Sequence, residues 1–100
     1  MLRVELAPEV AEDFDRLREH LLSHDSGNTG VRIREIIEAV SVLAHNPLIG
    51  RPSRRDCREL IIGRRSLGYV VLYRFVESVD TVFVLAIRGQ REAGNLAEFD

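Results

Sequence analysis

The sequence contains no lysine, so all 14 of its basic residues are arginine. Its single cysteine, Cys57, excludes an intrachain disulfide framework and suits a reducing compartment, with an inert buried thiol as the expected state. No apolar run approaches the roughly 18 residues of a membrane span. The first nine residues, "MLRVELAPE", also lack a long apolar segment after their charge. We therefore expect a cytoplasmic protein with no membrane contact.

The sequence also lacks patterns of metal-ligating residues and of phosphate-binding loops. No cysteine or histidine cluster has the spacing of a metal site. The glycines Gly27 and Gly30 lie between two predicted helices without a preceding strand, which excludes a nucleotide-binding loop. We therefore expect no metal and no cofactor. The length of 100 residues predicts a single domain, 1–100, that buries about 65% of its unfolded surface.

Charge is unevenly distributed along the chain, although the formal net charge is only −2. Residues 1–50 carry five arginines against nine acids, and residues 51–91 carry nine arginines against four acids. Residues 92–100 add three acids. Guanidinium groups favour carboxylate and phosphate forks, but an arginine-biased genome would explain the lack of lysine equally well. The basic character is thus local to the second half of the chain.

The first half of the chain predicts one strand and two amphipathic helices. "LRVEL" alternates apolar and polar residues, as a half-buried strand does. A helix over about 8–23 follows, with Pro8 at its first position and acids in its first turn. A second helix begins after "SHDSGNTG" with Asn28 or Thr29 as cap, and ends at Asn46 and Pro47. The apolar stripes of the two helices are Val10, Phe14, Leu17 and Leu21, then Ile33, Ile36, Ile37, Val40, Leu43 and Ala44. A short loop between such helices indicates an antiparallel hairpin.

The second half reads as strands. "LIGRPSRRD" is interpreted as a connecting loop, "RELIIG" as a short strand, and Tyr69–Val76 and Thr81–Arg88 as two longer strands around "ESVD". The order is βααβββ, without repeats. One helical hairpin must then cover one face of a mixed sheet, which predicts an α+β fold of two layers.

Arg74 and Arg88 are notable because arginine cannot lose its charge within an apolar strand. Alternation along Tyr69–Val76 places Tyr69 and Tyr73 on one face and Arg74 on the other. If the aromatic face is the core, as we expect for both tyrosines, Arg74 lies on the open, concave face, and Arg88 reaches the same rim from a strand end. A structural role for Arg74, paired with Glu59 or Glu77 across the sheet, stays open.

This combination resembles a known family over almost the whole chain, the RelE/ParE superfamily of toxins from type II toxin–antitoxin systems. The residues that carry the resemblance are "LAPEVAEDFDRL", "HNPLIGRPS", "RELIIGRRSLGYVVLYRF" and "TVFVLAIRGQREAG". The resemblance implies a helical hairpin packed on a small curved, mainly antiparallel sheet. It also implies a ParD-like cognate antitoxin that wraps the toxin in a hetero-oligomer and neutralises it.

Within the superfamily, the resemblance leaves a choice between toxins that poison DNA gyrase and toxins that cleave messenger RNA on the ribosome. The position after Gly68 and Tyr69, usually basic in the cleaving branch, is Val70 here. Asn95 stands where many relatives have tyrosine. All three histidines, His20, His24 and His45, lie on the helices or their ends. Arginine alone is a poor proton shuttle, so a cleaving enzyme would be weakly equipped. We therefore favour a ParE-like gyrase inhibitor that is not an enzyme, with an RNA-cleaving toxin or a non-toxic antitoxin-binding relative as alternatives.

The candidate contact residues follow from charge and position. A charged rim for the target consists of Arg64, Arg65, Arg74, Arg88 and Arg91, although Arg64 and Arg65 are equally consistent with ordinary solvated charges. For the antitoxin, a helical groove and a sheet edge accept an amphipathic helix and an added strand. The groove candidates are Val10, Phe14, Leu17, Ile33 and Ile37.

Overall fold

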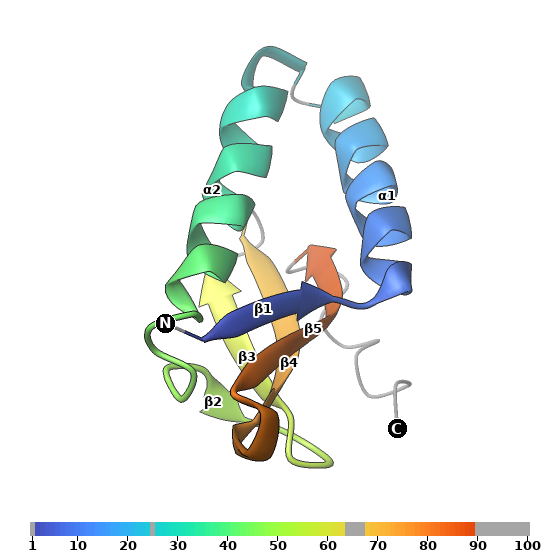
Figure 1. Cartoon of the computed structure of the whole chain (residues 1–100). Coiled ribbons are helices and arrows are strands. Elements are labelled where there is room, and N and C mark those ends of the chain that lie inside the picture. The colour runs from blue at the N-terminus through green and yellow to red at the C-terminus, as the bar shows by residue number, and fades with distance from the viewer. Residues whose placement is uncertain (1, 25, 64–67, 90–100) are drawn as a thin grey trace.

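The computed structural model describes residues 2–24, 26–63 and 68–89, which form two helices packed on one five-stranded sheet (Figure 1). The predicted α+β architecture is confirmed, with the helical hairpin on one face of a mainly antiparallel sheet. The helices α1 and α2 run antiparallel and are joined at the end remote from the sheet.

The helices begin and end close to the predicted positions. Helix α1 (Pro8–His24) starts with proline, which lacks the N–H that would be unsatisfied there, and carries Glu9 in its first turn. A short turn, η1 (Ser26–Asn28), leads into α2 (Thr29–Val42). Asn28 occupies the N-cap position of α2, but its side chain makes no capping hydrogen bond. The buried apolar side chains of the two helices are Val10, Leu17 and Leu21 from α1 and Ile36 and Val40 from α2.

The sheet contains the predicted strands and one further short strand. The strands are β1 (Arg3–Leu6), β2 (Arg51–Pro52), β3 (Arg58–Ile62), β4 (Tyr69–Val76) and β5 (Thr81–Gly89), in the order β1-β5-β4-β3-β2. Only the pairing of β1 with β5 is parallel. The prediction placed β2 in a loop, because two residues are too few to show a period and only their pairing with Glu59 and Arg58 defines the strand.

The core lies between the helices and one face of the sheet. Tyr69, Val71 and Tyr73 of β4 pack in the same cluster as the buried residues of α1 and α2. The aromatic face of β4 is therefore the core face, as predicted, and both tyrosines are buried. Val70 and Leu72 belong to a second cluster, with Cys57 and Ala86, on the opposite face of the sheet.

A β-bulge in β5 changes which residues face the helices. Leu72 pairs with Ala86, but the next residue, Tyr73, pairs with Val84, so Leu85 is the extra residue. Val84 and Ile87 consequently both lie in the core cluster although they are three positions apart. The shift moves Arg88 off the core face, opposite Val70.

Tyr73 fixes the loop between α2 and β2. Its hydroxyl accepts a hydrogen bond from the Gly50 amide and donates one to the Pro47 carbonyl, each at 2.8 Å. Gly50 must lack a side chain here, because a Cβ atom would lie 2.7 Å from the Tyr73 ring and 2.9 Å from the Glu59 carbonyl oxygen. The loop and β2 are thereby held against the end of the core.

Candidate functional site

The face of the sheet opposite the helices, which we call the open face, is apolar at its centre. Register and alternation place Ile61 of β3, Val70 and Leu72 of β4, and Ala86 of β5 on this face. Val70 and Ala86 are fully buried and Leu72 nearly so. Cys57 joins this cluster as a free, buried thiol, as the sequence predicted. The two arginines of the central strands, Arg74 and Arg88, lie at opposite ends of this apolar region.

Arg74 lies on the open face, as predicted, but its guanidinium group is directed toward the turn between β2 and β3. Its Nη2 donates to the Arg55 carbonyl oxygen at 2.7 Å and approaches the Cys57 sulfur at 3.8 Å. Its Nε is buried and has no hydrogen-bond partner within the described part of the chain. The alternative pairing with Glu59 or Glu77 is absent among the described ion pairs, and Glu59 instead pairs with Arg51 at 3.0 Å.

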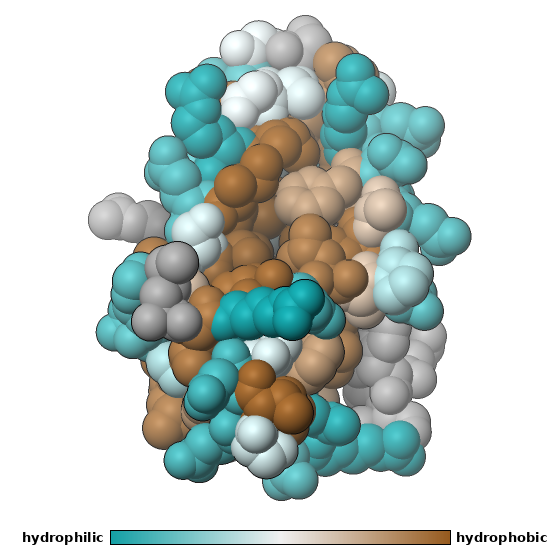
Figure 2. All heavy atoms as spheres, viewed as in Figure 1, coloured by the Kyte–Doolittle hydropathy of each residue, from teal (hydrophilic) through white to brown (hydrophobic). Residues whose placement is uncertain are grey.

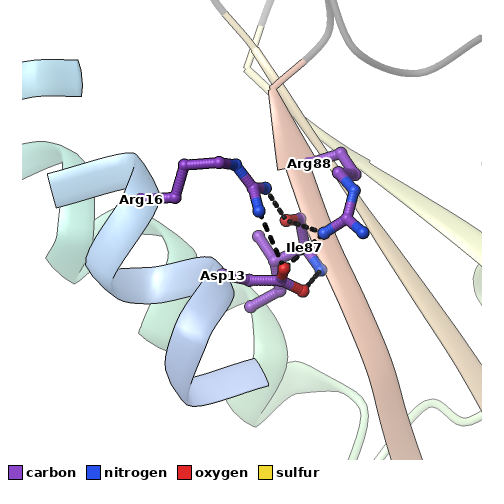
Figure 3. A network of polar contacts seen from close by, with 4 residues as sticks. All are labelled: Asp13, Arg16, Ile87 and Arg88. Atoms are coloured by element: carbon purple, nitrogen blue, oxygen red, sulfur yellow. Dashed lines mark hydrogen bonds and ion pairs between the residues drawn. The ribbon is translucent and has the colours of Figure 1, made fainter. Parts of the chain in front are cut away.

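Arg88 is held by an acidic residue of α1 (Figure 3). It forms an ion pair with Asp13, whose side chain is only 6% exposed, and the side chain of Arg88 itself is 17% exposed. Arg16, on the same helix, also pairs with Asp13, at 3.0 Å. The charge of Arg88 is thus neutralised within the molecule, which explains how a permanent cation is kept at the end of an apolar strand.

Asp13 and Arg16 also complete the edge of β5. Strand β1 runs beside β5 only as far as Leu6, opposite Val84, so the edge of β5 is unpaired beyond that point. The Ile87 amide donates to Asp13 Oδ2 at 2.9 Å, and Arg16 Nη2 donates to the Ile87 carbonyl at 3.2 Å. Two side chains of a helix therefore take the place of a neighbouring strand (Figure 3). We call this group of three residues, Asp13, Arg16 and Arg88, the edge clamp.

Two members of the predicted rim, Arg74 and Arg88, lie apart in the sheet. Arg88 pairs with Val70 in the sheet register, and Arg74 lies four residues further along β4. At about 3.3 Å per residue, the two arginines are about 13 Å apart along the strand, too far for both to hold one phosphate. Arg74 is bound to the β2–β3 turn and Arg88 to Asp13, and their shared role in target binding stays a prediction. Arg64, Arg65 and Arg91, also predicted to belong to the rim, lie outside the described residues.

The structure identifies a basic region in the segment that the sequence predicts to be only a connecting loop. "RPSRRDCR" places four arginines in eight residues. Arg51, Arg54 and Arg55 are exposed, whereas Arg58 donates to the Gly50 carbonyl at 2.7 Å and so supports the loop. The density of arginine in this segment was a signal available from the sequence. Only the folded hairpin, however, shows that it adjoins Arg74.

The predicted antitoxin-binding residues divide by burial. Val10 and Leu17 are 0% and 3% exposed, so they belong to the core and do not line an open groove, contrary to the expectation. Phe14 and Ile33 are half-buried, and Ile37 is 52% exposed. Ile33 and Ile37 are four residues apart on α2 and share one side of it. Figure 2 shows apolar side chains gathered between the two helices, above β1.

The described residues contain no cluster of three or more histidine, cysteine, aspartate or glutamate side chains that could hold a metal ion. Neither α1 nor α2 is long and apolar enough to cross a bilayer, and no other described helix is.

Comparisons with known proteins agree with this architecture. The family model of the ParE toxin of type II toxin–antitoxin systems matches residues 4–94. The chain is 32% identical over 92 residues to Toxin RelE3 of Caulobacter vibrioides, covering 92% of this chain and 98% of that protein.

Among solved structures, the chain resembles the chromosomal ParDE toxin–antitoxin system of P. aeruginosa, with a TM-score of 0.75, 22% identity, and coverage of 89% and 96% of the two chains. It also resembles a free-state variant of E. coli RelE, with a TM-score of 0.65, 17% identity, and coverage of 97% and 90%. These structural likenesses concern the fold. The family match and the relative together show that the chain belongs to the ParE toxin family of type II toxin–antitoxin systems, within the RelE/ParE superfamily.

Proposed function

We propose that this toxin acts by binding DNA gyrase and stalling it on cleaved DNA, which blocks replication, and that it is not itself an enzyme. The observation that carries the proposal is the composition of the open face. In the described part of the sheet, its centre consists of Ile61, Val70, Leu72 and Ala86, and the arginines of the central strands, Arg74 of β4 and Arg88 of β5, lie at opposite ends of this apolar region.

Cleavage of RNA requires groups that the described residues of this face do not bring together. A base must take the proton of the 2′-hydroxyl, an acid must protonate the leaving oxygen, and cations must converge on one phosphate. All three histidines of the chain lie in or next to the helices. Arg74 is engaged with a backbone carbonyl and Arg88 with Asp13, and an arginine does not exchange protons near neutral pH. A toxin that acts by binding has no such requirement.

Ribosome-dependent RNA cleavage is the second candidate, and the similarity to Toxin RelE3 favours it. The chemistry would then depend on residues outside those described, among them Arg64, Arg65 and Arg91. Asn95, in the position where many relatives have tyrosine, also lies outside the described residues, and it keeps the third alternative, a non-toxic antitoxin-binding relative.

A cognate, ParD-like antitoxin is the proposed partner in a hetero-oligomer. Its support is family membership, since the family is that of toxin–antitoxin systems. We place an amphipathic antitoxin helix on Phe14, Ile33 and Ile37, because these residues belong to the apolar stripes of α1 and α2 and are partly or largely exposed. Figure 2 shows apolar side chains gathered between the two helices. Val10 and Leu17 form the floor beneath that surface rather than the contact itself.

The deciding experiment is DNA supercoiling by purified gyrase with and without the toxin, scoring both lost supercoiling and trapped cleaved DNA. We expect trapped cleavage that disappears when the antitoxin is added. A parallel reaction with translating ribosomes and messenger RNA tests the second candidate. Unaffected gyrase together with cut messenger RNA would refute the proposal, and growth arrest without either effect would refute both candidates. Because gyrase acts on chromosomal DNA, this function would be exercised in the cytoplasm.

A further inference from the structure

The turn between β2 and β3 has an unusual backbone. Arg55 and Asp56 have φ angles of 53° and 61°, in the left-handed region that glycine and asparagine favour. The Cys57 amide donates to the Arg54 carbonyl at 2.9 Å, which closes the turn around these two residues in the pattern of a type I′ turn. The sequence thus places arginine and aspartate where Asn-Gly is usual, and the conformation must be stabilised by other contacts.

Arg74 supplies such a contact. Its Nη2 donates at 2.7 Å to the carbonyl oxygen of Arg55, the first of the two left-handed residues, and approaches the sulfur of Cys57 at the end of the turn. Its Nε is buried beneath these contacts. The guanidinium group is therefore directed at the turn, and its position suits a support for the turn better than a contact with a partner.

The turn between β2 and β3 presents exposed arginines. Arg54 and Arg55 are exposed at its tip, and Arg51 is exposed at its base, where it pairs with Glu59. Asp56 and Glu59 lie among these arginines, so the charge is mixed, although positive charge is in excess. Nucleic-acid sites usually present one sign of charge to many phosphates. The mixed pattern is better matched to a protein surface rich in carboxylates, with which arginine forms bidentate pairs.

We propose that Arg54 and Arg55, at the tip of the β2–β3 turn, contact an acidic surface of the target protein, and that Arg74 is a positioning residue that holds this turn in its left-handed conformation. The inference rests on the proposed function for the identity of the target, gyrase. The division of roles between Arg74 and the tip does not depend on which target it is.

The test uses two substitutions that separate support from contact. Arg74→Ala removes the hydrogen bond to the turn, and Asp56→Gly makes the left-handed turn favourable without Arg74 while leaving both tip arginines in place. Growth arrest in cells without antitoxin and inhibition of gyrase are measured for each single variant and for the pair. We expect Arg74→Ala to weaken both by roughly tenfold, the factor that corresponds to about 1.4 kcal/mol. Asp56→Gly in the same chain should restore most of that loss.

Conservative and control variants make the roles distinguishable. Arg74→Lys keeps one donor for the Arg55 carbonyl and should retain activity, because a single donor suffices there. Arg54→Ala with Arg55→Ala should lose activity while the turn is retained, and Arg34→Ala, an exposed arginine of α2, should change nothing. The backbone couplings and amide exchange of residues 54–57, measured by NMR, report the turn directly and also show whether each variant is folded.

The outcomes decide the inference separately from the proposed function. An Arg74→Ala variant that loses activity with an intact turn, or one that Asp56→Gly does not restore, would overturn the positioning role. Tip variants with full activity would overturn the contact, and tip variants whose defect is a loss of duplex DNA binding would overturn the protein surface as its partner. Growth arrest without any effect on gyrase would refute only the proposed function, because arrest still ranks the variants. A wild-type chain that arrests no growth would overturn both the target contact of Arg54 and Arg55 and the proposed function. The NMR backbone couplings of residues 54–57 would still decide whether Arg74 holds the turn.

Discussion

Replacing Asp13 should strongly destabilise the protein, because one buried carboxylate satisfies three groups. It accepts the Ile87 amide at 2.9 Å and pairs with Arg16 and Arg88. In Asp13→Ala, the Ile87 amide loses its partner, and Arg88, whose side chain is 17% exposed, loses its ion pair with Asp13. Breaking a buried ion pair from one side costs about 3–5 kcal/mol. Since Arg16 is 41% exposed and finds water, we expect a loss of about 3 kcal/mol.

The Asp13→Asn variant divides this loss into two parts. Its amide oxygen still accepts the Ile87 N–H, so the edge of β5 remains paired, but the charge that compensates Arg88 is gone. Hydrogen bonds to charged groups contribute about 1.5–3 kcal/mol and neutral ones about half of that. We therefore expect Asp13→Asn to cost about 2 kcal/mol. Asp15→Ala, an exposed acid two residues away on the same helix, should stay within about 0.5 kcal/mol of the parent and serves as the control.

Urea unfolding followed by circular dichroism measures these differences. A loss of about 3 kcal/mol moves the midpoint by roughly 2 M for a domain of this size. Hydrogen exchange of the Ile87 amide gives an independent readout, which should accelerate strongly in Asp13→Ala and only modestly in Asp13→Asn. A cost below about 1 kcal/mol for Asp13→Ala, or equal exchange of the Ile87 amide in the two variants, would refute the edge clamp as described.

Three further predictions concern the loop after α2 and the helical groove. Tyr73→Phe should lower the free energy of unfolding by about 2 kcal/mol, because the Gly50 amide then lacks its buried acceptor; urea unfolding with no loss would contradict this. Gly50→Ala should lower the free energy of unfolding by about 1–3 kcal/mol, because the new Cβ atom would overlap with Tyr73. Gly30→Ala, with open space around its Cβ atom, should be neutral or stabilising by up to about 1 kcal/mol. Equal melting temperatures of the two variants would be inconsistent with this packing. Ile37→Asp should weaken antitoxin binding, measured by titration calorimetry, by at least about tenfold, while Val31→Asp, equally exposed at 52% on another side of α2, should not; equal effects would remove the groove from the contact.

The fold could be predicted because its signals are local. Apolar stripes at helical spacing, Pro8 at a helix start and alternation along Tyr69–Val76 each report on neighbouring residues, and the structure confirms the elements they predict. The two-residue strand β2 could not be predicted, since it exists only through its pairing with β3. The target-binding residues stay predictions, because charge and spacing do not reveal which arginines are already paired within the protein.

The sequence by itself determined the order of the elements, the core face of β4 and the excess of arginine after residue 50, because helix and strand periods and side-chain charge are written in neighbouring positions. Tertiary structure alone decided what Arg74 and Arg88 bind. The bulge at Leu85 moves Arg88 off the core face, and Asp13, 75 positions earlier in the chain, pairs with it at the edge of β5. The left-handed turn at Arg55 brings a carbonyl oxygen to Arg74. Such contacts join residues that are distant in sequence, and a permanent charge takes its role from the partner that folding brings to it.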